Sequence, residues 1–256
     1  MNACIADRAK RSFTRSFQSY HEGASEQARI ADALAQRLAD LSLSKPFQSA
    51  FEIGCGTGHL THALLNRFSI ASLTVNDLVP NACHLAESVG ADFLEGDIRS
   101  VIWPKAPHLI ASASTLQWMD APEALLRKAA QTLAPGGWLA FSGFGPAQFN
   151  ELRALGSTAQ APGLCLPEAL AGAVQTAGAG RFEIADVGQD RRQLWFDSPI
   201  DVLRHLQQTG VNAVAANTWT RATLARFSAR YIEAFGAPGG VPLTYHPIWI
   251  IAHKDA

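Results

Sequence analysis

The sequence predicts an α/β fold with a doubly wound, mostly parallel β-sheet and helical insertions near the ends of its strands. Apolar segments of strand length alternate with helical patterns up to residue 144, which indicates a parallel sheet with right-handed crossovers. A turn rich in glycine follows the first predicted strand. At 256 residues, one domain with insertions is favoured over two independent domains.

Local patterns define the elements of this first region. Apolar residues recur at helical spacing over residues 24–41, and Pro122 opens a further helix. Turn signals such as Ala134-Pro135-Gly136-Gly137 separate the elements. The predicted strands cover residues 49–53, 70–76, 91–94, 108–113 and 138–144, and the helices between them cover residues 59–68, 81–89 and 122–133.

The second half of the chain breaks this alternation. A long or bulged strand is predicted over residues 181–196 and another over residues 243–253, with a helical stretch over 198–235 and an irregular segment over 145–167. We therefore expect one domain, residues 1–256, made of a core and three additions. These additions are a helical N-terminal arm at 1–43 and cap insertions at 147–170 and 198–236.

The overall composition excludes several classes of protein. Hydrophobic residues make up 48% of the chain, enough for a filled core, and a net charge of −1 argues against nucleic-acid binding. No apolar run approaches the roughly 20 residues of a membrane span. The four cysteines lack CxxC spacing, so we expect neither a metal site nor disulfide bonds, and a cytoplasmic location.

The glycine-rich turn reads Glu52-Ile53-Gly54-Cys55-Gly56-Thr57-Gly58. Glycine has no Cβ, so a ligand can approach such a backbone closely where a strand feeds a helix. The third glycine of a dinucleotide-binding fingerprint would fall at His59, which counts against NAD or FAD. A phosphate-binding P-loop is excluded because no Gly-Lys-Ser/Thr ending follows.

Acidic residues stand at three points around this turn. Asp77 closes the next strand about 20 residues on, where a carboxylate can accept both hydroxyls of an adenosine ribose. Asp97 ends the third strand, where an adenine amino group would lie. Glu52 adds negative charge that would repel a pyrophosphate but suits a sulfonium cation.

With these segments the sequence resembles the class I S-adenosylmethionine-dependent methyltransferases. The resemblance covers E-I-G-C-G-T-G at 52–58, N-D at 76–77, G-D-I at 96–98 and L-A-P-G-G-W-L-A-F at 133–141. It implies a Rossmann-like seven-stranded sheet whose one antiparallel strand would be residues 243–253. It also implies S-adenosyl-L-methionine as cofactor, S-adenosyl-L-homocysteine as product, and cofactor binding by Glu52, Gly54, Gly56, Gly58, Asp77, Leu78, Asp97 and Ile98.

The remaining segments resemble the malonyl-(acyl-carrier protein) O-methyltransferases, which begin pimelate synthesis for biotin. The similar segments are residues 11–24, 114–118, 141–153, 194–212 and 243–249. The resemblance implies methyl transfer to the free carboxylate of a malonyl thioester carried by an acyl-carrier protein or coenzyme A. Two departures bear on the carrier or acyl chain: Tyr20-His21 replaces Tyr-Asp, and Ser142-Gly143-Phe144 replaces Ser-Thr-Phe.

This implied reaction needs no general base. A malonyl carboxylate, with a pKa of roughly 4, is already ionised at neutral pH. We therefore assign no catalytic proton-transfer residue and expect catalysis by alignment and exclusion of water. An arginine would best hold the substrate carboxylate, because its planar guanidinium binds carboxylates bidentately. The candidate substrate-binding residues are Tyr20, His21, Arg153, Arg204, His205, Tyr245 and His246.

Acyl-carrier proteins are acidic, so we expect this protein to have a basic surface that binds one. Three clusters are candidates: Arg8, Lys10, Arg11 and Arg15; Arg191 and Arg192; and Arg221, Arg226 and Arg230.

Three alternative functions stay open. A methyltransferase for an aconitate-like acid or a quinone precursor would share the glycine turn and its acidic partners. A non-enzymatic module that binds an adenosyl ligand would also keep them. A dehydrogenase is disfavoured by His59 and by the absence of a Tyr-x-x-x-Lys pair.

Overall fold

The computed structural model describes residues 25–209 and 220–256. These residues divide into two compact units. The sheet unit comprises residues 25–145, 162–189 and 247–256, and the described part of the cap unit comprises residues 146–161, 190–209 and 220–246. Residues 1–24 of the predicted arm lie outside the described part of the chain.

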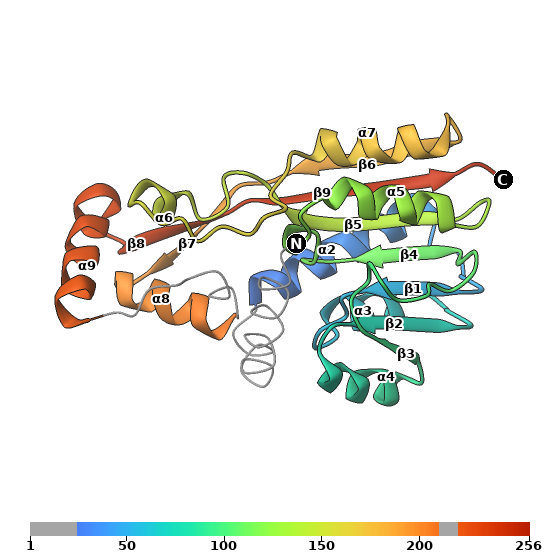
Figure 1. Cartoon of the computed structure of the whole chain (residues 1–256), viewed down its shortest axis with the longest axis horizontal. Coiled ribbons are helices and arrows are strands. Elements are labelled where there is room, and N and C mark those ends of the chain that lie inside the picture. The colour runs from blue at the N-terminus through green and yellow to red at the C-terminus, as the bar shows by residue number, and fades with distance from the viewer. Residues whose placement is uncertain (1–24, 210–219) are drawn as a thin grey trace. The chain divides into compact units, whose positions relative to one another are not determined.

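The sheet unit contains a seven-stranded sheet in the order β3-β2-β1-β4-β5-β9-β6 (Figure 1). Its strands are β1 (Ala50–Ile53), β2 (Leu73–Asp77), β3 (Asp92–Glu95), β4 (Leu109–Ser112), β5 (Trp138–Phe144), β6 (Phe182–Gln189) and β9 (Pro247–Lys254). Only β9 runs antiparallel to its neighbours, β5 and β6. The predicted fold class, a mostly parallel sheet with one antiparallel strand, is confirmed.

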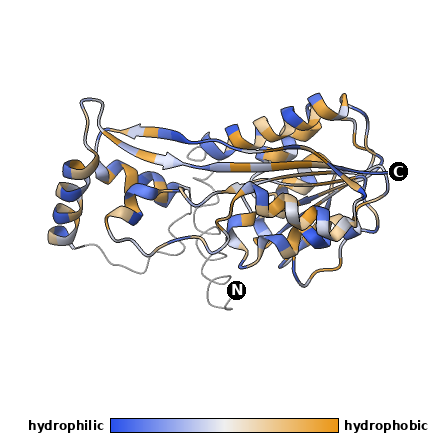
Figure 2. Cartoon of the chain, turned by 90° about the horizontal axis from the view of Figure 1, so that it is seen from above, coloured by the Kyte–Doolittle hydropathy of each residue, from blue (hydrophilic) through white to orange (hydrophobic). Residues whose placement is uncertain are grey.

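Helices cover both faces of this sheet. They are α2 (Ser25–Ser42), α3 (His59–Leu65), α4 (Cys83–Val89), α5 (Pro122–Thr132) and α7 (Pro167–Gly178), with short 3-10 helices η1 (Pro80–Ala82) and η2 (Leu116–Trp118). Alternate strand residues such as Phe51, Ile110 and Phe141 form one apolar cluster with α5 and α7. Figure 2 shows the consequence, strands that are largely apolar and helices that alternate apolar and polar residues.

Four predicted helices and five predicted strands are confirmed with small shifts of their ends. Two predictions are wrong. Residues 181–196 form two strands, β6 and β7 (Arg192–Phe196), and residues 243–253 also divide, into β8 (Val241–Tyr245) and β9. The β-type pattern continues through both breaks, so it does not reveal that the chain passes from one sheet to another. Helix α7 is a further element that the sequence pattern did not indicate.

The cap unit is built on a second sheet, in which β7 and β8 pair antiparallel. Its helices are α6 (Asn150–Ala154), α8 (Pro199–Gln208) and α9 (Arg221–Phe235), which confirms the helical prediction for the described residues of 198–235. Side-chain caps fix the starts of both longer helices, through Ser198 for α8 and through Thr220 and Thr223 for α9.

Buried polar contacts join the elements of the cap unit to one another. The carboxylate of Glu151, which is 1% exposed, accepts hydrogen bonds from the backbone nitrogen and hydroxyl of Thr244 and so ties α6 to β8. The Tyr231 hydroxyl donates to the Pro242 carbonyl oxygen at 2.7 Å and ties α9 to the same strand. Within the two described ranges, no helix is long and apolar enough to cross a membrane.

Candidate active site

The glycine-rich turn connects β1 to α3 at the carboxyl end of the parallel strands. Gly54, Gly56 and Gly58 have φ angles of 70°, 53° and 94°, in the left-handed region that favours glycine. The backbone nitrogens of Gly54 and Cys55 donate to the Asn76 carbonyl oxygen at 2.8 and 3.0 Å. The turn is therefore fixed to the end of the neighbouring strand β2.

The three glycines serve different purposes. A Cβ at Gly54 would collide with the Thr115 side chain, and a Cβ at Gly58 would collide with Leu85. A Cβ at Gly56 would meet nothing within 4 Å. The first and third glycines are therefore required by packing, whereas Gly56 leaves open space that a ligand can occupy.

Asp77, predicted as a ribose ligand, also holds the turn itself. Its Oδ2 accepts a hydrogen bond from the Gly56 nitrogen at 2.8 Å, and its Oδ1 accepts one from the Val79 nitrogen at 2.8 Å. Burial raises the pKa of this carboxyl, and these backbone hydrogen bonds oppose the rise. Each carboxylate oxygen can accept a second hydrogen bond, so Asp77 can still bind a ligand hydroxyl.

Glu52 lies directly before the turn, and its side chain is buried against α3. The residue is 1% exposed, and its Oε2 accepts a hydrogen bond from the Thr61 hydroxyl at 2.7 Å. Burial is the main cause that raises the pKa of Glu52 to about 7; the charge of Asp77 adds to the rise, and the hydrogen bond from Thr61 opposes it. Two buried carboxyl groups beside one turn favour a cationic ligand over an anionic one.

Cys55, within the turn, is buried and free. Burial, followed by the charges of Glu52 and Asp77, raises the pKa of its thiol. The thiol is therefore protonated at neutral pH and unsuited to act as a nucleophile.

The remaining predicted cofactor-binding residues follow the ends of β2 and β3. The Asp97 carboxylate forms an ion pair with Arg99, and the hydrogen bond from Arg99 lowers the pKa of Asp97. Ile98 is buried in the core, and Leu78 is half-buried after β2. Asn76, for which the sequence predicted no role, donates from its amide to the carbonyl oxygens of Leu94 and Gly96 at 2.8 and 3.0 Å. It thus joins the ends of β2 and β3.

Several buried polar side-chain atoms of the sheet unit have no hydrogen-bond partner in the described ranges. They are the hydroxyls of Thr57, Ser114 and Ser142 and the Oε1 atoms of Gln27 and Gln117. Thr57 belongs to the glycine turn, and Ser114 follows the end of β4. Because an unsatisfied buried polar atom costs about 1–3 kcal/mol, such a group suits a polar ligand that would complete these bonds.

In the cap unit the structure pairs two of the predicted substrate residues. The Tyr245 side chain is fully buried, and its hydroxyl lies 2.7 Å from Nε2 of His205. The ring of Phe149 packs edge-on against Tyr245 at 5.1 Å between centroids. A tyrosine and a histidine held this way present polar atoms within apolar surroundings.

His246 follows Tyr245 and is 1% exposed. Its Nδ1 accepts a hydrogen bond from the Ala147 nitrogen at 2.9 Å, so the hydrogen-bond network assigns the ring proton to Nε2. Burial, and then the nearby charge of Arg191, lower the pKa of His246. The imidazole is therefore neutral at physiological pH.

Arg153 and Arg204, also predicted to bind the substrate, make other contacts. Arg204 forms an ion pair with Asp201 at 2.7 Å, and its side chain is 69% exposed. Arg153 donates to the Pro146 carbonyl oxygen. Tyr20 and His21 lie outside the described residues.

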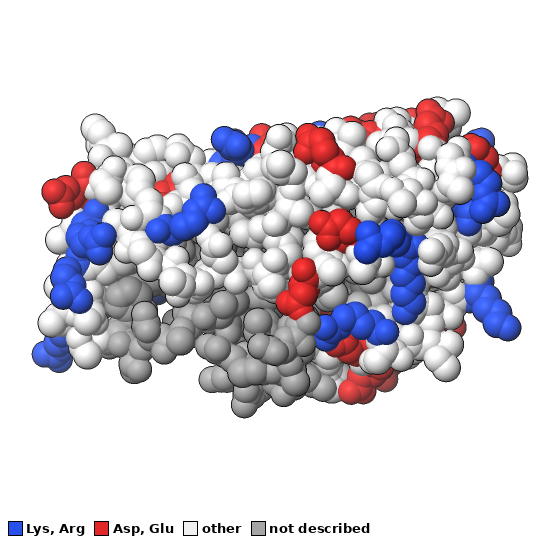
Figure 3. All heavy atoms as spheres, turned by 45° about the horizontal axis from the view of Figure 1, so that its top comes forward, with Lys and Arg blue, Asp and Glu red and all other residues white. Residues whose placement is uncertain are grey.

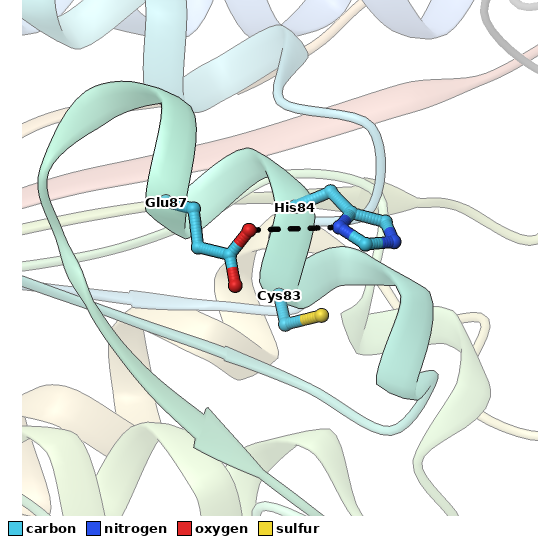
Figure 4. A group of neighbouring side chains, drawn as sticks. All are labelled: Cys83, His84 and Glu87. Carbon is cyan, nitrogen blue, oxygen red and sulfur yellow. Dashed lines mark ion pairs between the residues drawn. The ribbon is translucent and has the colours of Figure 1, made fainter.

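Cys83, His84 and Glu87 form a small group on helix α4, with ligand atoms within 4.8 Å of one another (Figure 4). Nδ1 of His84 lies 3.6 Å from a carboxylate oxygen of Glu87, and these two side chains are 76% and 75% exposed. The three residues come from one exposed helix turn, and we assign them no metal.

Comparison with known proteins agrees with this geometry. Residues 51–141 match the family model described as "Methyltransferase domain". Among solved structures, the chain resembles the plantazolicin methyltransferase BpumL in complex with SAH (TM-score 0.57, 16% identity, 98% of this chain and 95% of that one). It also resembles the 1,6-didemethyltoxoflavin-N1-methyltransferase of Burkholderia thailandensis (TM-score 0.52, 16% identity, 95% and 87%). At this identity the likeness concerns the fold.

Sequence relatives extend the match over both units. The chain is 34% identical to the malonyl-(acyl-carrier protein) O-methyltransferase of Bacteroides thetaiotaomicron, over 94% of this chain and 95% of the relative. It is also 34% identical to the enzyme of that name from Haemophilus ducreyi, over 98% and 99%. Full-length identity at this level establishes that the chain belongs to the malonyl-(acyl-carrier protein) O-methyltransferase family.

Proposed function

We propose that this protein transfers a methyl group from S-adenosyl-L-methionine to the free carboxylate of malonyl-acyl-carrier protein, the first step of pimelate synthesis for biotin. The observation that carries the proposal is the match to the relatives, which spans the cap unit as well as the glycine turn. A relative that shared only the methyl-donor site would not be expected to match across residues 190–246.

The residues proposed for the donor site all belong to the sheet unit. Gly56 leaves room for a ligand beside the backbone, and Asp77 and Glu52 place two buried carboxyl groups next to it. We propose that Asp77 accepts the ribose hydroxyls, that Glu52 contributes negative charge, and that Leu78, Asp97 and Ile98 surround the adenine. The bound donor supplies an electrophilic methyl group on a positively charged sulfur.

The proposal needs no residue that removes a proton. A malonyl carboxylate is ionised at neutral pH, with a pKa of roughly 4. Cys55 and His246 would be poor bases, because the Cys55 thiol is protonated and the ring of His246 already accepts a backbone hydrogen bond. The protein would contribute alignment and an environment with little water.

For the acceptor, the cap unit offers its paired side chains. We propose that His205 and Tyr245 contact the malonyl group, since their polar atoms lie together beside the half-buried rings of Phe149 and Phe196. Arg153, Arg204, His246, Tyr20 and His21 stay predictions for the same role. The three free cysteines among the described residues fit the expected cytoplasmic location.

A methyl-transfer assay with labelled S-adenosylmethionine tests the proposal. Malonyl-acyl-carrier protein, malonyl-coenzyme A and free malonate are offered side by side, and label should enter an ester of the carrier-bound malonyl group. The released S-adenosylhomocysteine is measured in the same samples. Absence of transfer to either thioester would refute the proposed acceptor and favour another small carboxylic acid or a quinone precursor.

A further inference from the structure

Helix α9 of the cap unit carries an excess of positive charge. Its residues include Arg221, Arg226 and Arg230 but only one acidic residue, Glu233. The whole chain, by contrast, has 21 basic and 22 acidic residues. Figure 3 shows basic side chains gathered at the left edge of the view, where Figure 1 draws α9.

These three arginines are exposed and carry no ion pair to any carboxylate within residues 25–209 and 220–256. Five other arginines of the described ranges do pair with carboxylates: Arg29, Arg37, Arg67, Arg99 and Arg204. Within these ranges no carboxylate forms an ion pair with the arginines of α9, and their charge stays available to an acidic partner.

The opposite face of α9 holds the helix rigidly in the cap unit. Tyr231 is fully buried, and its ring packs edge-on against Phe227 and Phe235 at 5.5 and 5.6 Å between centroids. These ring contacts lie within α9, and the hydrogen bond from the Tyr231 hydroxyl to the Pro242 carbonyl oxygen ties the helix to β8. The arginines therefore stand on a fixed support.

The outer face also allows another helix to approach. Exposed alanines at positions 222, 225 and 229 lie between the arginines, and Ile232 is 55% exposed. Arg226 and Arg230 are four residues apart and so project from one side of the helix. Small residues, one apolar side chain and flanking positive charges are complementary to an acidic amphipathic helix.

We propose that α9 is the docking surface for the acyl-carrier protein, with Arg221, Arg226 and Arg230 binding an acidic helix of the carrier. This inference rests on the proposed function, and it names the surface that recognises the partner. Contacts at such a charged rim act mainly on the rate of association and weaken with salt.

The test compares two acceptors that share the malonyl group but differ in the carrier. Wild type and the double variant Arg226→Glu/Arg230→Glu are assayed with malonyl-acyl-carrier protein and with malonyl-pantetheine, which has no protein part. We expect kcat/KM of the variant to fall about tenfold or more for the carrier-bound substrate and to change little for malonyl-pantetheine. Rising salt should lower the wild-type rate with the carrier far more than the rate with malonyl-pantetheine.

Two further variants keep the result interpretable. Arg127→Glu reverses one exposed charge on α5 of the sheet unit and should leave both rates unchanged. Arg226→Gln/Arg230→Gln removes the charges with a side chain that favours helix, and circular dichroism checks that α9 stays folded.

Each outcome decides the proposal. An equal loss with both acceptors, or no loss with either, would overturn docking through α9 but would not count against the proposed methyl transfer by the wild type. If α9 instead contacted a nucleic acid or a second copy of the chain, the variants would spare the carrier-dependent rate. A wild-type protein that methylates neither acceptor would refute the proposed function, and the docking proposal would fall with it.

Discussion

Glu52→Gln should stabilise the protein in a way that depends on pH. Folding moves the pKa of this buried carboxyl from 4.5 to about 7. Each pKa unit is worth about 1.4 kcal/mol, so the ionised side chain lowers the free energy of unfolding by about 3 kcal/mol above pH 7. The sign follows from the raised pKa, because the native state is favoured while the group is protonated and loses that advantage as pH rises. Glutamine has nearly the same shape and can still accept the hydrogen bond from Thr61.

Urea denaturation, followed by tryptophan fluorescence at several pH values, measures this effect. The variant and wild type should have similar stability near pH 4.5. Between pH 4.5 and 7 the free energy of unfolding of the variant should rise above that of wild type, by up to about 3 kcal/mol. Above pH 7 this difference should stay constant. Glu87→Gln, at a side chain that is 75% exposed, controls for the loss of one negative charge. A difference between wild type and Glu52→Gln that is the same at every pH would refute the reasoning.

The same variant bears on ligand discrimination. The methyl donor carries a positive sulfur and the product does not, so a carboxylate near the turn should favour the donor. Calorimetry should therefore find a smaller ratio between the two affinities in Glu52→Gln than in wild type. An unchanged ratio would remove Glu52 from the proposed cofactor site and leave its effect on stability untouched.

Four further predictions address the two units separately. Gly56→Ala should lower the free energy of unfolding by about 1–2 kcal/mol, because alanine is strained in the left-handed region. It should also strongly weaken cofactor binding, because the added methyl group enters the open space proposed for the ligand. Gly90→Ala, with a similar φ of 68° and the same open space, should cost the same stability without affecting the cofactor, as thermal unfolding and calorimetry can check. Asp77→Asn should lower cofactor affinity about tenfold or more in a protein that stays folded, because one backbone N–H that donates to Asp77 loses its acceptor. Unaltered affinity, measured by calorimetry, would argue against the donor site. Glu151→Ala should destabilise the cap unit by about 3 kcal/mol because it leaves buried Thr244 donors unpaired, and faster hydrogen exchange should be confined to α6 and β8. Tyr245→Phe should raise KM for the malonyl acceptor and leave cofactor affinity unchanged; equal effects on both would indicate a structural role.

The sequence alone located the first five strands of the large sheet and the glycine-rich turn that follows β1. Strand and helix periods, together with the turn signals, are local properties of the chain, and they located β1 to β5 and the helices between them. The glycine spacing also predicted the turn, because left-handed backbone at a strand end restricts the residue type to glycine. Asp77 was predicted from its place at the end of the next strand. Parallel strands then bring the ends of β1, β2 and β3 together whatever the details of packing.

Only the tertiary structure decided how the second half of the chain is divided. The β-type patterns at 181–196 and 243–253 look like single strands, since a sequence pattern does not state which partner each residue pairs with. The register shows instead that β6 and β9 complete the large sheet while β7 and β8 pair with each other.

Contacts between distant residues were also beyond the sequence. His205 meets Tyr245 across 40 positions, and Glu151 meets Thr244 across 93. The raised pKa of Glu52 depends on burial against α3, and the double use of Asp77 depends on the path of the turn. Residue type and spacing determined which chemistry was available to this protein, whereas burial and long-range pairing, which arise only when the chain folds, decided which of those groups are charged and which of them meet.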